Sequence, residues 1–163
     1  MNTNRILVIG YGNSIRGDDA AGWQAAVTLA REDDISGDPR VDITPTAQLS
    51  PELAADLART DEAIFVDASC EGTPGEINVN SLEDSSIPLG EMPHALTPPD
   101  LAGLTRQIYD WTGRSTLVTI TGRSFGFQQK LSPPVEAAFP ELLQTIRKRV
   151  TQALSTDTSA SAG

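Results

Sequence analysis

The chain has 163 residues, 39% hydrophobic and 21% charged, which is typical of a single soluble globular domain. Its formal net charge of −10 argues against nucleic acid and anionic membranes as general partners, because both require a basic surface. No apolar segment approaches the roughly 20 residues of a membrane span, and no signal peptide is apparent. The single cysteine, Cys70, cannot form an internal disulfide and is expected to be a small packed residue. We therefore expect a cytoplasmic monomer with one domain over residues 1–154 and a polar tail over 155–163.

Short apolar runs alternate with helical patterns along the chain. Strands are predicted at 5–9, 41–44, 63–66, 76–80 and 115–121. Helices are predicted at 17–32, from 50, at 97–112 and at 135–154. This alternation predicts an α/β three-layer sandwich, in which helices cover both faces of a mostly parallel, twisted sheet of about five strands. The loops that follow the parallel strands then meet at one edge of the sheet.

Two of these helices carry specific local expectations. The first should bury an apolar stripe at spacings of three and four. That stripe consists of Trp23, Ala26, Val27 and Ala30. The second should begin with Ser50 as its N-cap and Pro51 at its first position.

The loop after the first strand, GYGNSIRGDD, has glycines that suggest a phosphate site. The dinucleotide fingerprint needs a third glycine, but the chain has Gly10, Gly12 and then Ile15 at that position. No Gly-Lys pair exists for a phosphate loop. Asp18 and Asp19 would also repel a phosphate. One of these two carboxylates can serve as a helix cap, and the second suggests a cation.

Two further candidate ligands occur in other loops. Asp67 directly follows the buried strand 63–66, and His94 is the only histidine in the chain. If the first strand and the strand 63–66 are neighbours, Asp67 lies beside the loop of Asp18 and Asp19. Asp67 could instead hold its own loop, and a lone histidine is more often a surface or core residue. Two carboxylates and one imidazole would form an open site that suits nickel, zinc or cobalt.

With these residues in place, the sequence resembles the nickel–iron hydrogenase maturation endopeptidases. The likeness rests on four motifs in order along the chain. They are GYGNSIRGDDAAG at 10–22, IFVDA at 64–68, PH at 93–94, and the loop and helix start at 122–138. The resemblance implies that Asp19, Asp67 and His94 are both metal ligands and catalytic residues. Asp18 would then cap its helix or orient Asp19.

The resemblance also implies a substrate. Family members remove a C-terminal extension from the hydrogenase large-subunit precursor, which carries the nickel; other divalent ions are expected to enter the empty site. Asn13 and Gln48 are candidate substrate contacts, and the segment 44–52 resembles the branch serving bidirectional, NAD-linked hydrogenases. The hydrolytic step could use the metal or a carboxylate base. Two other functions stay open: a precursor-binding chaperone without proteolysis, and a nucleotide-binding regulator.

Overall fold

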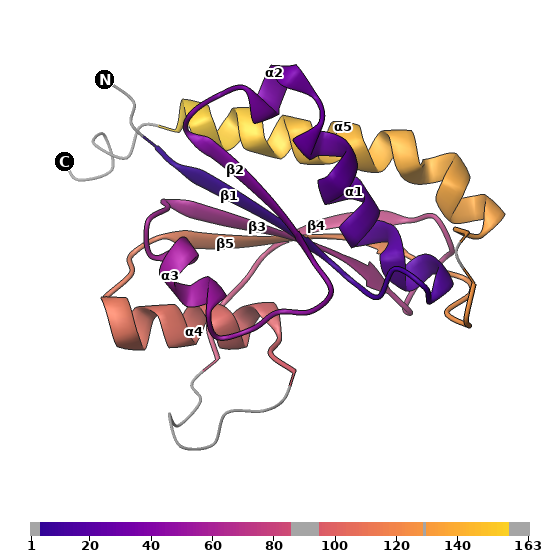
Figure 1. Ribbon diagram of the computed structural model, residues 1–163, viewed down its shortest axis with the longest axis horizontal. Helices are drawn as coiled ribbons and strands as arrows, with labels where there is room; N and C mark the ends of the chain where they lie inside the picture. Colours follow the sequence, from indigo (N-terminus) through magenta and orange to yellow (C-terminus); the bar gives the residue numbers. More distant parts are fainter. Residues whose placement is uncertain (1–3, 86–94, 129, 157–163) are drawn as a thin grey trace.

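The computed structural model describes residues 4–85, 95–128 and 130–156, and its centre is a five-stranded sheet (Figure 1). The strands are β1 (Ile6–Tyr11), β2 (Val41–Thr46), β3 (Glu62–Ser69), β4 (Ile77–Ser81) and β5 (Arg114–Thr121). Their order is β2-β1-β3-β5-β4, and only β4 runs antiparallel to its neighbour. The α/β fold predicted from the sequence is therefore confirmed.

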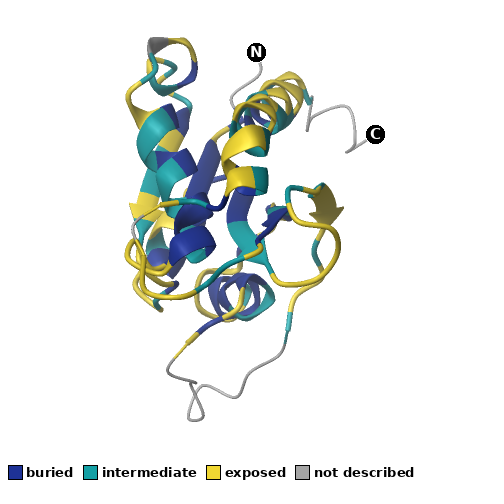
Figure 2. Cartoon of the chain, turned by 90° about the vertical axis from the view of Figure 1, so that its right-hand side faces the viewer, coloured by how far each residue is buried: buried dark blue, intermediate teal, exposed yellow. Residues whose placement is uncertain are grey.

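Helices cover both faces of the sheet, and each face has its own apolar core. The elements are the 3₁₀ helix η1 (Gly17–Ala20), α1 (Ala21–Ala30), α2 (Asp33–Ser36), α3 (Leu53–Leu57), α4 (Pro98–Tyr109) and α5 (Pro133–Ser155). Helices α1 and α5 pack on one face, and α3 and α4 pack on the other (Figure 1). Figure 2 shows that the strands between these layers are mostly buried. No helix among the described residues is long and apolar enough to cross a membrane.

The first helix differs from its prediction in both its start and its buried face. It is divided into η1 and α1, and the buried residues of α1 are Ala21, Gly22, Ala25, Ala26 and Leu29. The expected stripe is wrong except for one alanine, since Trp23 and Val27 are only half-buried and Ala30 is exposed. The reason is close packing: a Cβ atom on Gly22 would lie 2.2 Å from the carbonyl oxygen of Val66.

Two other local predictions are also wrong. Helix α3 begins at Leu53 with Glu52 as its N-cap, so Ser50 does not cap it. The Leu53 N–H donates to Ser50 O at 3.1 Å and the Ala54 N–H to Pro51 O at 3.0 Å, so this segment forms i→i+3 turns that precede the α-helix. Cys70, the residue after the end of β3, is exposed and not packed.

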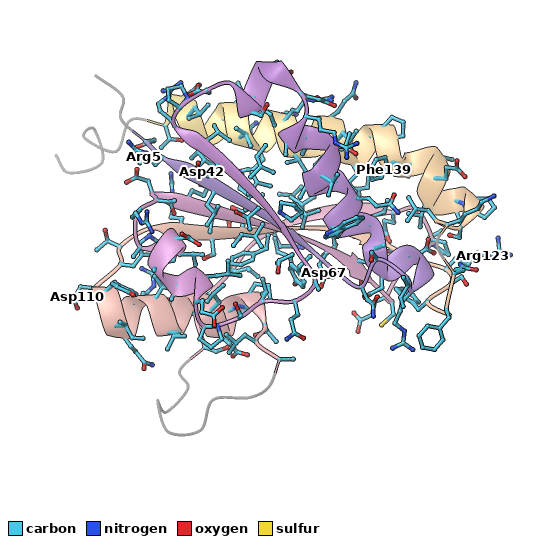
Figure 3. All side chains as sticks on the ribbon, viewed as in Figure 1. Arg5, Asp42, Asp67, Asp110, Arg123 and Phe139 are labelled. Carbon is cyan, nitrogen blue, oxygen red and sulfur yellow. The ribbon has the colours of Figure 1, made fainter. Side chains whose placement is uncertain are left out.

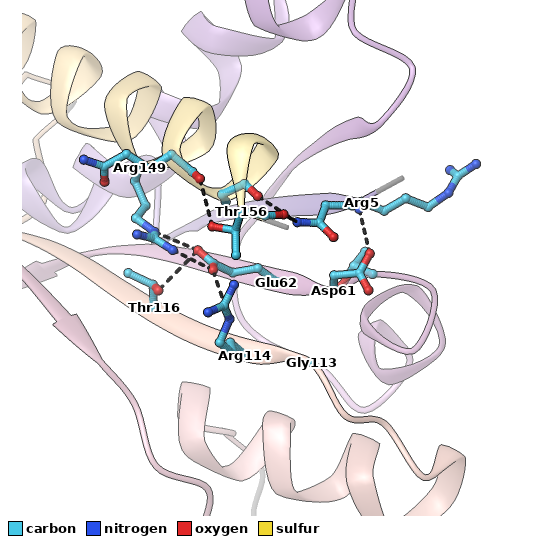
Figure 4. Close-up of polar contacts among 12 residues, drawn as sticks. Arg5, Asp61, Glu62, Gly113, Arg114, Thr116, Arg149 and Thr156 are labelled. Carbon is cyan, nitrogen blue, oxygen red and sulfur yellow. Dashed lines mark hydrogen bonds and ion pairs between the residues drawn. The ribbon is translucent and has the colours of Figure 1, made fainter. Parts of the chain in front are cut away.

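The amino edge of the sheet holds a buried carboxylate that is fully paired. Only 2% of the Glu62 side chain is exposed. Arg149 of α5 donates from Nε to Glu62 Oε2 at 2.8 Å and from Nη2 to Oε1 at 2.7 Å (Figure 4). Thr116 Oγ1 donates to Oε2 at 3.4 Å, and Arg114 adds an ion pair at 3.8 Å. These contacts tie the last helix to β3 and β5.

Replacing Arg149 with methionine should lower the free energy of unfolding by about 2–3 kcal/mol, because it leaves the buried Glu62 carboxylate with only the long contacts from Thr116 and Arg114. The matched control is Arg59→Met, which removes an ion pair between Arg59 and Asp56 whose arginine side chain is 76% exposed. That control should cost less than about 0.5 kcal/mol. Urea denaturation measures both. Equal losses would show that the Glu62 network does not stabilise the fold as argued.

Candidate functional site

The ends of β1 and β3 bring Tyr11 and Asp67 together at the carboxyl edge. The register pairs Gly10 with Val66, so the next residue of each strand is Tyr11 and Asp67. The Tyr11 hydroxyl donates to Asp67 Oδ2 at 2.9 Å, and the Ala68 N–H donates to Asp67 Oδ1 at 2.7 Å. Figure 3 shows Asp67 at the opposite end of the sheet from Asp42. The sequence reasoning missed Tyr11 as a partner of Asp67, although the strand register would have indicated it.

Asp19 reaches the same edge from η1. Its Oδ2 accepts a hydrogen bond from the Asn13 N–H at 2.8 Å. Gly12 has φ = 150°, and a Cβ atom on it would lie 1.8 Å from the carbonyl oxygen of Asp19. The glycine therefore permits η1 to pack directly against the end of β1. This close packing accounts for Gly12 without a bound phosphate.

The two carboxylates act on each other electrostatically. Burial raises the pKa of Asp67 to about 6; the negative charge of Asp19 adds to this, and the hydrogen bonds from Tyr11 and Ala68 oppose it. Burial also raises the pKa of Tyr11, with further increases from Asp67 and Asp19. The phenol therefore remains protonated and donates to Asp67. The site concentrates negative charge at the ends of two neighbouring strands.

No cationic side chain neutralises this charge within the part of the chain that the structure describes. Neither Asp19 nor Asp67 forms an ion pair there, in contrast to Glu62 at the amino edge. The same residues contain no group of three or more histidine, cysteine, aspartate or glutamate side chains arranged to hold a metal. His94 lies outside the described residues. The structure thus brings together Asp19 and Asp67, and the third ligand stays a prediction.

Asp18 has a structural role that the sequence did not reveal. It is fully buried, and its side chain caps neither η1 nor α1. Its Oδ2 accepts from the Arg123 N–H at 2.7 Å and the Ser124 N–H at 2.9 Å. Ser132 donates its N–H to Oδ1 at 2.7 Å and its hydroxyl to Oδ2 at 2.6 Å. Burial raises the pKa of Asp18, but these four hydrogen bonds outweigh it and leave the pKa below its usual value.

The two candidate substrate contacts lie in loops that leave the same edge. Asn13 is exposed, and its Oδ1 accepts from the Ile15 N–H at 3.1 Å, which shapes the loop before η1. Gln48 is exposed just beyond β2, where its carbonyl oxygen accepts from the Thr46 hydroxyl at 3.1 Å. Both positions are open to a ligand at the rim. Their contact with a substrate stays a prediction.

No family model matches the chain, but comparison with known proteins finds similar proteases. The chain is 29% identical to the hydrogenase 2 maturation protease of Escherichia coli (strain K12) over 148 residues, which are 87% of this chain and 88% of that protein. An endopeptidase from Escherichia coli, solved in solution, is 28% identical, with a TM-score of 0.69 over 87% of this chain and 89% of its own.

A further solved structure shares the fold at lower identity. The NiFe hydrogenase maturation protease HycI from Thermococcus kodakarensis KOD1 has a TM-score of 0.71 and 23% identity, and 94% of each chain is covered. The likenesses at 28% and 29% identity define the class of the protein as an endopeptidase, here built on an α/β fold. The relative at 29% identity is a hydrogenase maturation protease, and the likeness at 23% identity shows that the chain shares the fold of a second one.

Because the Asp18 side chain holds the loop after β5 through four hydrogen bonds, its replacement should cause a large, pH-dependent loss of stability. Asp18→Asn should lower the free energy of unfolding at pH 7 by about 2–4 kcal/mol, because an amide cannot accept all four hydrogen bonds. Since the folded pKa is lowered, this contribution is present above the ordinary pKa of about 4 and is lost as pH falls through the folded value. Urea denaturation at pH 7 and near pH 3 should therefore show the deficit shrinking in acid. The free energy of unfolding of the exposed control Asp56→Asn should change little at either pH. An Asp18→Asn variant as stable as that control would contradict the structural role of the Asp18 hydrogen bonds.

The raised pKa of Asp67 predicts the opposite pH dependence of stability from that of Asp18. Protonated Asp67 contributes stability that is full below its ordinary pKa of about 4 and is lost as pH rises through about 6. Without added metal, the stability of Asp67→Asn relative to the wild type should rise by up to about 3 kcal/mol between pH 4 and pH 8. Urea denaturation at the two pH values tests this. For the exposed control Asp42→Asn, the stability relative to the wild type should be the same at both pH values. The same constancy for Asp67→Asn would show that the surroundings do not destabilise the charged form of Asp67.

Proposed function

We propose that this endopeptidase removes the C-terminal extension of a hydrogenase large-subunit precursor, and that Asp19, Asp67 and His94 bind the nickel carried by that precursor. The observation that carries the proposal is the pair of neighbouring carboxylates that lacks a cationic partner among the described residues. The similarity to the hydrogenase 2 maturation protease of Escherichia coli supports the choice of substrate.

The donor atoms at this edge suit an intermediate divalent ion. Asp19 Oδ1 accepts no hydrogen bond from the described residues, so it is free to bind a cation. Each oxygen of Asp67 accepts one hydrogen bond and keeps a second lone pair. Carboxylate oxygens together with an imidazole nitrogen suit nickel as well as zinc or cobalt. A bound cation would also offset the repulsion between Asp19 and Asp67.

The proposed roles follow from these positions. Asp19 and Asp67 complete the shell of an ion that arrives on the precursor, and they thereby fix the scissile segment against the sheet edge. Bound nickel supplies positive charge that can polarise the scissile carbonyl. Tyr11 holds Asp67 in place by its hydrogen bond. Asn13 and Gln48 contact the precursor from the flanking loops, and the segment 44–52 supports a client among the bidirectional, NAD-linked hydrogenases. The reaction takes place in the cytoplasm.

The test is cleavage of a nickel-loaded precursor, followed by mass spectrometry of the large subunit. The wild-type protein should shorten the precursor, and nickel-free precursor should stay intact. Asp19→Asn, Asp67→Asn and His94→Ala should each lower the rate by at least about 100-fold, since loss of a mere outer-shell partner typically costs 10–100-fold. Asp42→Asn, an exposed carboxylate at the amino end of β2, is the matched control and should cleave at the wild-type rate.

Two outcomes would contradict the proposal in different ways. Undiminished cleavage by Asp19→Asn and His94→Ala would show that metal binding by these residues is not needed for cleavage. Binding of the nickel-loaded precursor by the wild-type protein, with its mass unchanged, would identify the alternative function as a chaperone.

A further inference from the structure

Two loops far apart in the sequence are joined by backbone hydrogen bonds beside the candidate site. The Gln128 N–H donates to Ile15 O at 2.9 Å, and the Gly17 N–H donates to Gln128 O at 2.8 Å. The Asp18 N–H donates to Ser124 O at 2.9 Å. The buried side chain of Asp18 adds the four hydrogen bonds described above. The loop after β5 is therefore hydrogen-bonded at several points to the start of η1 and to the segment before it.

This braced unit presents an aromatic ring to solvent. Phe127 is 78% exposed and Ile15 is 47% exposed. The guanidinium of Arg16 lies over the Phe127 ring, 4.8 Å from its centroid. Phe127 belongs to neither of the two apolar cores formed by the described residues. The interior of the fold thus gives no reason for an aromatic side chain at this position.

We call Ile15, Arg16, Arg123 and Phe127 the Phe127 patch. Aromatic and arginine side chains dominate the binding energy of protein interfaces. A frame that is already rigid loses little conformational entropy when a partner binds. The patch combines both properties, because the Asp18 carboxylate holds the backbone at Arg123, and the hydrogen bonds of Gln128 to Ile15 and Gly17 hold the backbone beside Arg16 and Phe127. These features are typical of a protein–protein docking surface.

The position and charge of the patch indicate the partner. Asp19, a candidate ligand, directly follows Asp18, the residue that braces the patch. Figure 3 shows Arg123 beyond Asp67, on the side of the molecule away from Arg5 and Asp42. A substrate protein that brings its ion to Asp19 and Asp67 must lie across this rim. Arg16 and Arg123 place two exposed positive charges here on a chain of net charge −10, which favours an acidic partner surface.

We propose that the Phe127 patch docks the folded body of the large-subunit precursor next to the scissile segment. It would receive an apolar side chain of the precursor that is flanked by acidic residues. This inference rests on the proposed function, and it adds a contact distant from the reacting bond. Because the contact is made equally before and during the reaction, it contributes to substrate affinity and leaves the chemical step unchanged.

The central test is Phe127→Ser with a nickel-loaded precursor that the wild-type protein binds. The KM for cleavage and the Kd for binding should both rise at least about tenfold, while kcat stays within about twofold. The free energy of unfolding should be unchanged, since the ring is mostly exposed. The matched control is Tyr109→Ser, an aromatic residue that is 49% exposed at the end of α4, and it should keep the wild-type KM.

The charged part of the patch has a separate readout. Arg16→Gln combined with Arg123→Gln should raise KM and weaken its dependence on salt, because screening acts on the charges removed. A Phe127→Ser variant with wild-type KM and Kd would overturn the docking proposal while leaving the proposed function intact. If the wild-type protein binds the precursor without cleaving it, the proteolytic function fails and the Kd of Phe127→Ser still decides the docking. No binding by the wild-type protein would overturn both.

Discussion

The close approach of α1 to the sheet is the constraint on which the site depends. Gly22 lies against the backbone of Val66, and Gly12 lies against the backbone of Asp19, so neither position has room for a Cβ atom. With η1 held this closely, Asp19 stands over the ends of β1 and β3. A larger residue at Gly22 would move the helix away and separate Asp19 from Asp67. The glycines of the first loop therefore serve to bring carboxylates together.

The acidic groups at the two edges of the sheet have opposite surroundings: Glu62 is buried and paired with arginine, and the partly buried Asp67 has no cationic partner among the described residues. At the amino edge, Glu62 is satisfied by Arg149, Arg114 and Thr116, an arrangement that stabilises the fold. At the carboxyl edge, Asp67 accepts hydrogen bonds from the Tyr11 phenol and the Ala68 N–H. Burial raises its pKa, and no cation among the described residues offsets that effect. Such a disfavoured charge is expected where a protein binds a cation as part of its function.

Much of this architecture could be predicted from local patterns. The apolar runs located all five strands, and Asp67 could be placed at the carboxyl edge because it follows a buried strand. The role of Asp18 could not be predicted, since its partners lie more than 100 positions away in a loop without a regular pattern. The stripe expected on α1 failed because the helix face is selected by the close contact at Gly22. The exposure of Phe127 likewise depends on tertiary contacts between two loops.

The proposed role of Asp19 and Asp67 is to complete the coordination of an ion that arrives on the substrate. X-ray absorption at the nickel edge tests it most directly, on the loaded precursor alone and on its rapidly frozen complex with the protein. Nickel should gain oxygen or nitrogen neighbours in the wild-type complex and should lose them when both aspartates are replaced by asparagine. A nickel shell that is identical in the free precursor and in the wild-type complex would contradict it.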